Sequence, residues 1–140
     1  MSAFHMLKLI LKLNPINFIL NMITEIYDGS SYDRKMRKME KYLNIDINNT
    51  LKELWKDEKY VDHDWYLSKG GDDCLFAILN RNYIKKIKLP QKKVHRGGFT
   101  VWFICLTFQD GTRDKLYARQ DPKGLTDIYN WFQDYESFLQ

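Results

Sequence analysis

Several features that would identify an enzyme or a metalloprotein are missing from this sequence of 140 residues. It contains no G-x-S-x-G, P-loop or G-x-G-x-x-G pattern, so no motif points to a reaction. The three histidines are scattered, and Cys74 and Cys105 lie 31 positions apart without a CxxC or HxxxH pair. We therefore expect no metal and no cofactor, and we interpret both cysteines as reduced core residues of an intracellular protein.

Glycine and proline are also scarce, with seven and three residues respectively. Because 44% of the residues are hydrophobic and 15% are aromatic, the composition is that of a packed core and excludes a disordered chain. The length fits a single domain of common size.

The first 27 residues are apolar, but they lack the long uninterrupted run of a membrane span. Two lysines and an Asn-Pro pair interrupt the run, whereas a span needs about 20 nearly uninterrupted apolar residues. The charges do not precede the apolar region, as they would in a signal peptide. The pattern predicts two amphipathic helices, over 3–13 and 16–27, that pack on the domain, lie at a membrane surface or form a homodimer.

Two further helices are expected before the first strand, which gives an N-terminal helical segment over 1–58. Ser31 can cap a helix that runs to about Asn44, with a narrow apolar stripe and an opposed basic face. Leu51, Leu54 and Trp55 mark a shorter helix.

From about residue 60, apolar residues recur at every second position. This pattern predicts an antiparallel sheet in a second segment over 59–140. Short connections favour a meander of consecutive strands. A helix that starts at Asp121-Pro122 has a wide apolar stripe and is expected to close the sheet. The predicted fold class is therefore α+β. The expected strands are 64–69, 74–80, 83–89, 99–108 and 113–119.

The hairpin around Asp110-Gly111 predicts how its strands pair, because turn geometry and hydrophobic register must agree. A two-residue loop would mix apolar and basic residues on one face. A three-residue loop with a G1 bulge at Gly111 separates them into a core face and a half-exposed aromatic and basic face. The core face contains Trp102, Ile104, Leu106, Phe108, Leu116 and Ala118. The other face contains Val101, Phe103, Cys105, Thr107, Arg113, Lys115, Tyr117 and Arg119.

The net charge of +4 is concentrated in one part of the chain, because residues 74–109 carry seven Lys or Arg and no Asp or Glu. On the strand over 83–89 we expect Lys85 to face inward and Ile84 outward. We interpret 92–98 as a basic, glycine-ended loop between strands that suits an anionic partner. Outward lysines also protect an edge strand from aggregation, so a structural role stays open beside a binding role. The candidate binding residues are Lys85, Lys86, Lys88, Lys92, Lys93, His95, Arg96, Arg113, Lys115, Tyr117 and Arg119.

The most enzyme-like cluster is Asp62-His63-Asp64. In an extended strand the two carboxylates share one face and the imidazole lies on the other, so the three groups do not converge. A solvated loop is the simpler interpretation, and a small enzyme or nuclease is the alternative.

Consecutive antiparallel strands, basic inter-strand loops and a closing helix with a tryptophan (GLTDIYNWFQDYESF) after LTFQDGTRDKLYA resemble a pleckstrin-homology-like domain. The resemblance covers residues 60–140. It implies a partly open barrel and a non-catalytic module that binds a protein or an anionic headgroup. We expect a cytoplasmic adaptor that is peripheral at the membrane. Nucleic-acid binding through the basic segment over 81–96 is the alternative, with Tyr117 as a stacking surface.

Overall fold

The computed structural model describes residues 29–70, 76–119 and 121–140, without the side chains of residues 29–32 and of Arg119. It divides into two compact units, with the boundary between Asp57 and Glu58. The helices expected over 3–13 and 16–27 lie outside the described residues.

The first unit contains two described helices, α3 (Gly29–Leu43) and α4 (Ile47–Leu54). The apolar stripe of α3 is buried at Met36 and Met39, as its helical spacing predicts. Asp46 caps α4, since its carboxylate accepts a backbone N–H from the first turn.

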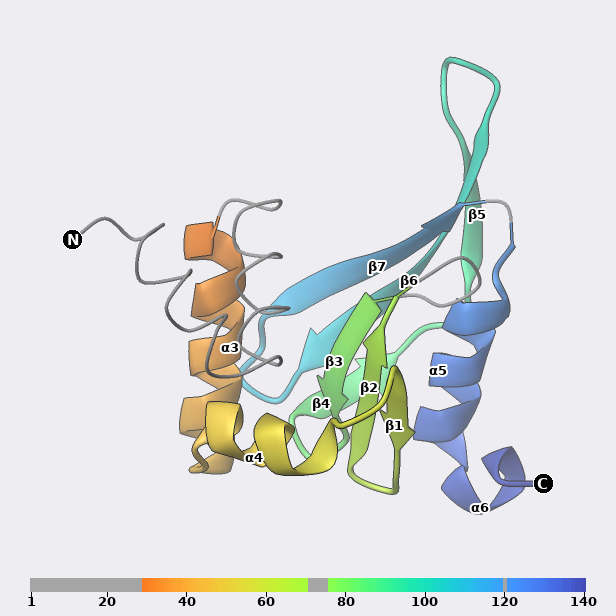
Figure 1. The fold of residues 1–140 in the computed structure, drawn as a ribbon. Coiled ribbons are helices and arrows are strands. Elements are labelled where there is room, and N and C mark those ends of the chain that lie inside the picture. The colour runs from red at the N-terminus through yellow and green to blue at the C-terminus, as the bar shows by residue number, and fades with distance from the viewer. Residues whose placement is uncertain (1–28, 71–75, 120) are drawn as a thin grey trace. The chain divides into compact units, whose positions relative to one another are not determined.

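The described residues of the second unit form seven antiparallel strands in two sheets, followed by two helices (Figure 1). The α+β class and the C-terminal helix are confirmed, and the two sheets do not close into a barrel. Five strands lie where the sequence predicts them, but the expected total of five is wrong because two short strands were missed. The strands are β1 (Lys59–Val61), β2 (Trp65–Lys69), β3 (Phe76–Asn80), β4 (Ile84–Ile87), β5 (Gln91–Val94), β6 (Thr100–Phe108) and β7 (Arg113–Arg119).

In the second sheet, β6 is the central strand. Both β4 and β5 pair with the same edge of β6, one after the other, and β7 pairs with the opposite edge. The β5–β6 pair extends past the rest of the sheet as a two-stranded hairpin (Figure 1). The central strand β6 therefore belongs both to a sheet that is three strands wide and to the projecting hairpin.

The turn between β6 and β7 has the predicted three-residue loop. Gly111 adopts a φ of 87°, and its N–H donates to the Phe108 carbonyl at 3.0 Å, while the Phe108 N–H donates to Thr112 at 2.9 Å. The resulting register pairs Ile104 with Leu116 and Cys105 with Lys115, as expected. Glycine is required at this position because the left-handed conformation is unfavourable for other residues.

Two neighbouring residues at the start of β6 depart from the predicted faces. Val101 is buried, with 7% of its surface exposed, whereas Trp102 is only half-buried. The twist of a nine-residue strand turns its faces relative to the core, so a strict alternation does not hold along its whole length.

The orientation expected for the strand over 83–89 is also wrong. A register irregularity lies between Ile84 and Lys86, where β4 pairs with β6. Both Ile84 and Ile87 are buried, and both Lys85 and Lys86 are exposed. An extra residue in one strand of a pair shifts the alternation by one, which explains why Lys85 faces outward.

The single C-terminal helix expected from the sequence is divided into α5 (Lys123–Gln133) and α6 (Tyr135–Phe138). Asp134 is extended and caps α6 through the N–H of Ser137. Helix α5 contacts β6 and β7 and buries Leu125, Ile128 and Trp131 completely.

Candidate functional site

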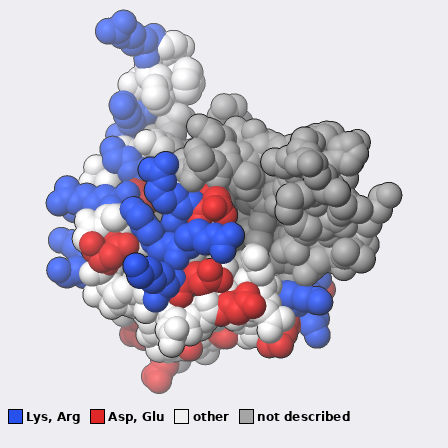
Figure 2. All heavy atoms as spheres, turned by 90° about the vertical axis from the view of Figure 1, so that its left-hand side faces the viewer, with Lys and Arg blue, Asp and Glu red and all other residues white. Residues whose placement is uncertain are grey.

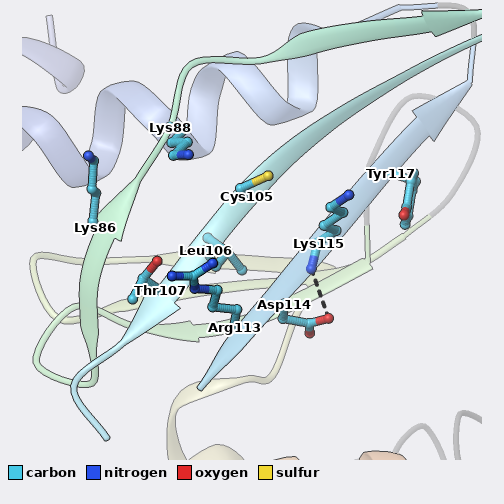
Figure 3. A pocket seen from close by; sticks show the side chains of 9 residues that line it. All are labelled: Lys86, Lys88, Cys105, Leu106, Thr107, Arg113, Asp114, Lys115 and Tyr117. Carbon is cyan, nitrogen blue, oxygen red and sulfur yellow. Dashed lines mark hydrogen bonds between the residues drawn. The ribbon is translucent and has the colours of Figure 1, made fainter. Parts of the chain in front are cut away.

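The outer face of the second sheet carries an open basic groove of about 630 Å³. Figure 3 shows Lys86 and Lys88 on one side, Arg113 and Lys115 on the other, and Cys105 and Thr107 of β6 between them. We call this site the basic groove. Its lining residues are Lys86, Lys88, Cys105, Leu106, Thr107, Arg113, Asp114, Lys115 and Tyr117.

The strand register builds the groove from cross-strand rows. In the first row Thr107 lies between Lys86 and Arg113. In the second row Cys105 pairs with Lys115, and on its other side its carbonyl accepts the backbone N–H of Lys88 at 3.1 Å. Short side chains on the central strand and long cationic side chains on both flanks produce the hollow.

The four cations of the groove are available to a ligand. Lys86, Lys88, Arg113 and Lys115 are exposed, and within the described part of the chain none of them forms an ion pair. The carboxylate of Asp114 accepts the backbone N–H of Lys115 at 2.8 Å. An anion that enters the groove therefore meets cations that need not break an ion pair with a described carboxylate.

The next row along β6 ends the groove with aromatic rings. Phe103 pairs with Tyr117, and their ring centroids lie 6.1 Å apart. The Lys115 ammonium lies 5.0 Å from the centre of the Phe103 ring. Tyr117 is 53% exposed, so one ring of this pair is accessible from solvent.

The segment expected as a basic loop over 92–98 is instead largely a strand and a turn. Gln91 to Val94 form β5, whose register pairs Lys93 with Val101. The His95 N–H donates to the Phe99 carbonyl at 3.0 Å, and Gly98 adopts a φ of 83° in the turn. The loop interpretation is wrong for residues 92–94, because their backbone pairs with β6. The strand was missed because its polar sequence has no apolar alternation.

The turn at the end of this hairpin, residues 94–99, exposes apolar and cationic side chains together. Val94 is 66% exposed and Phe99 is 56% exposed, and the His95 ring stacks on Phe99 at 4.8 Å. A second open hollow of about 490 Å³ lies here, lined by Lys93, Val94, His95, Arg96, Gly97 and Phe99. Figure 2 shows Lys and Arg along the projecting hairpin and no acidic side chain on it. We call residues 94–99 the hairpin tip.

The predicted binding residues therefore fall into separate places. The groove brings together Lys86, Lys88, Arg113, Lys115 and Tyr117, and the second hollow brings together Lys93, His95 and Arg96. Lys92 lies on the hairpin with its ammonium 5.8 Å from the Trp102 ring. Lys85 is exposed and lines neither hollow, and the Arg119 side chain is outside the described atoms.

Sequence reasoning missed several site residues as candidates. Thr107 and Phe103 were assigned to the aromatic and basic face without a role in binding, although their places on β6 follow from the turn register. Val94 and Phe99 had no such signal, because an apolar residue beside a Gly-Gly turn is compatible with either burial or exposure.

Asp62-His63-Asp64 forms a structural turn. One Asp62 oxygen accepts the N–H groups of Asp64 and Trp65 at 2.9 and 2.6 Å, and the other accepts the Tyr60 hydroxyl at 2.8 Å. That hydrogen bond raises the pKa of the Tyr60 hydroxyl. The imidazole of His63 contacts Asp64 at 3.1 Å.

Arg81 fastens this turn to helix α5. Its guanidinium donates to the carbonyls of His63 and Phe132 at 2.6 and 2.5 Å and also to that of Trp131. The Trp131 indole N–H in turn donates to the Asp62 carbonyl at 2.7 Å. Partial burial lowers the pKa of Arg81, which remains a cation. We call this set of contacts the Arg81 brace.

Two kinds of feature were not found among the described residues. Across 29–70, 76–119 and 121–140, no three His, Cys, Asp or Glu side chains gather closely enough to hold a metal ion. Within the same part of the chain, no helix is both long and apolar enough to cross a membrane. Cys105 is a free, half-buried thiol, and Cys74 lies outside the described residues.

Comparison with protein-family models, with curated proteins and with solved structures finds no match to this chain.

Proposed function

We propose that this protein is a non-catalytic binding module that docks on an anionic membrane surface through its β5–β6 hairpin. The observation that carries the proposal is the hairpin tip, where Val94 and Phe99 are both more than half exposed among basic side chains. Apolar side chains ringed by cations suit the boundary between headgroups and acyl chains. The proposal places the protein in the cytoplasm, peripheral at the membrane.

The expected binding is weak and reversible. Full burial of a side chain such as Val or Phe contributes about 1.5–3 kcal/mol. Each Lys or Arg near an anionic leaflet contributes about 1 kcal/mol, and this contribution falls with salt. Lys92, Lys93 and Arg96 supply such cations along the hairpin, without an acidic residue between 74 and 109.

The arrangement of the second unit supports the resemblance to a pleckstrin-homology-like domain. In the described part of this unit, antiparallel strands in two sheets precede the C-terminal helices, which is the element order on which the resemblance rests. A module of that kind binds its partner on surface elements of a rigid scaffold. A protein partner for the same tip is the alternative to an anionic membrane surface.

The experiment is cosedimentation of the full chain with two kinds of vesicle, phosphatidylcholine alone and phosphatidylcholine mixed with phosphatidylserine. The wild-type protein is expected to sediment with the mixed vesicles and to dissociate as salt rises. Val94→Ser with Phe99→Ser should abolish sedimentation, and Lys93→Ala with Arg96→Ala should weaken it. Both pairs are exposed, so the fold should be retained.

Leu139→Ser is the matched control for the apolar change, because Leu139 is 64% exposed but lies after α6. Lys123→Ala is the control for charge, since Lys123 is exposed at the start of α5. Equal sedimentation of wild-type protein and tip variants, or equal binding to both kinds of vesicle, contradicts the proposal.

A further inference from the structure

We propose that the basic groove is a separate binding site for single-stranded nucleic acid. None of its lining residues belongs to the hairpin tip, so this site does not depend on the membrane proposal. The spacing of the cations and the aromatic end of the groove both suit an unpaired nucleic-acid strand.

The spacing of the cations matches the repeat of the phosphates along a nucleic-acid strand. The row of Lys86 and Arg113 crosses β6 at Thr107, and the row of Lys88 and Lys115 crosses it at Cys105. Two residues along an antiparallel strand advance by about 6.8 Å. This advance is comparable to the separation of successive phosphates along an extended nucleic-acid strand, so each row can bind one phosphate.

The first row has suitable groups for a phosphate. Arg113 offers a planar fork of N–H donors, which matches phosphate oxygens in a bidentate manner. The Thr107 hydroxyl lies between Arg113 and Lys86 in the register, and Figure 3 shows the Arg113 guanidinium directed toward it. The second row offers two ammonium groups as point charges.

The aromatic end supplies a site for a base. Tyr117 is 53% exposed and lies one row beyond Lys115 along the groove, with Phe103 beside it. Bases stack on exposed aromatic rings whatever their sequence. A strand whose phosphates occupy the two cationic rows can therefore place a base on Tyr117.

The exposed aromatic ring at the end of the groove favours a single strand over a duplex. A duplex keeps its bases stacked on one another, so it cannot place one flat on Tyr117, whereas an unpaired strand can.

The test is fluorescence anisotropy of a labelled single-stranded oligonucleotide with the full chain, over a series of salt concentrations. Lys86→Ala with Arg113→Ala should reduce the salt dependence, lowering the slope of log K against log salt by about 0.7 per cation removed. Tyr117→Leu should weaken binding by about tenfold, and Tyr117→Phe should retain it because the stacking ring remains. These side chains are exposed, and circular dichroism of each variant checks the fold.

Lys93→Ala with Arg96→Ala is the matched control, since it removes the same charge from the β5–β6 hairpin, outside the groove. It should change oligonucleotide affinity less than twofold while weakening vesicle binding. The groove variants should do the reverse, so failure of one proposal is distinguishable from failure of the other.

Three results would overturn the inference. The first is equal loss of oligonucleotide binding in the tip and groove variants, which indicates non-specific charge. The second is equal affinity for a mononucleotide and an oligonucleotide, which indicates a small-molecule site. The third is loss of vesicle binding in the groove variants, which assigns the groove to the membrane.

Discussion

The Arg81 brace and the basic groove use polar side chains in opposite ways. In the brace, Arg81 donates to three carbonyls, and each carboxylate oxygen of Asp62 accepts a hydrogen bond. In the groove, four cations are exposed without an ion pair to any described carboxylate. The cluster with an enzyme-like composition therefore holds the fold together, and the groove, which contains no motif, has groups that can bind a ligand.

The largest effect on stability is expected from Arg81→Met. This change removes the donors to two carbonyls at the end of α5 and to His63, so the free energy of unfolding should fall by about 3 kcal/mol. Urea denaturation measures the change. Lys85→Met is the control, because Lys85 is exposed and its replacement should stay within about 0.5 kcal/mol. A similar loss in both variants would remove the distinction between the two clusters.

A smaller loss is expected from Asp62→Ala. The N–H groups of Asp64 and Trp65 and the Tyr60 hydroxyl lose their acceptor, which should lower the free energy of unfolding by about 2 kcal/mol. His63→Ala should cost less than about 0.5 kcal/mol, since the ring is exposed. A larger loss for His63→Ala than for Asp62→Ala would contradict the structural role of the Asp62 carboxylate.

A third effect is confined to alkaline pH. Burial, together with a 2.7 Å hydrogen bond to Asp110, raises the pKa of Tyr83 to about 12 from its ordinary value of 10.0. Because the folded-state pKa is the higher one, the stabilisation is complete below pH 10 and is lost as pH rises from 10 to 12. Denaturation at a series of pH values should show a shallower alkaline decline in Tyr83→Phe than in the wild-type protein. An unchanged decline would be inconsistent with this assignment.

The smallest effect on stability is expected in the groove itself. Lys86→Ala with Arg113→Ala removes exposed cations that lack a described acidic partner, so the free energy of unfolding should change by less than about 0.5 kcal/mol. The same double variant should bind the oligonucleotide more weakly than the wild-type protein does. A loss of several kcal/mol would show that these residues are structural.

The β6–β7 hairpin shows how far local sequence reasoning extends. The loop length, the left-handed Gly111 and the strand register were all predictable, because an incorrect register would have placed basic residues on the apolar face. The aromatic and basic face of the groove followed from the same register. The inward direction expected for Lys85 was wrong because the β4 irregularity depends on pairing with β6, 20 residues or more away in the chain.

The failure to predict β1 and β5 has a similar explanation. β1 has three residues and β5 is a polar, exposed segment, so neither carries an apolar alternation. Each strand exists because a neighbour offers a ladder of backbone donors and acceptors. The Arg81 brace was missed as well, since its partners lie about 18 and 50 residues away in the sequence.

Local pattern was enough to establish the α+β class, the closing helix, the concentration of positive charge and the geometry of one turn. These properties depend on residues close together in the chain, where periodicity and turn chemistry act. Long-range pairing was needed to separate the basic residues into a groove and a hairpin tip, and to assign Asp62 to the fold. Whether a cation lies beside an open groove, an apolar tip or a backbone carbonyl depends on strands that meet only after folding.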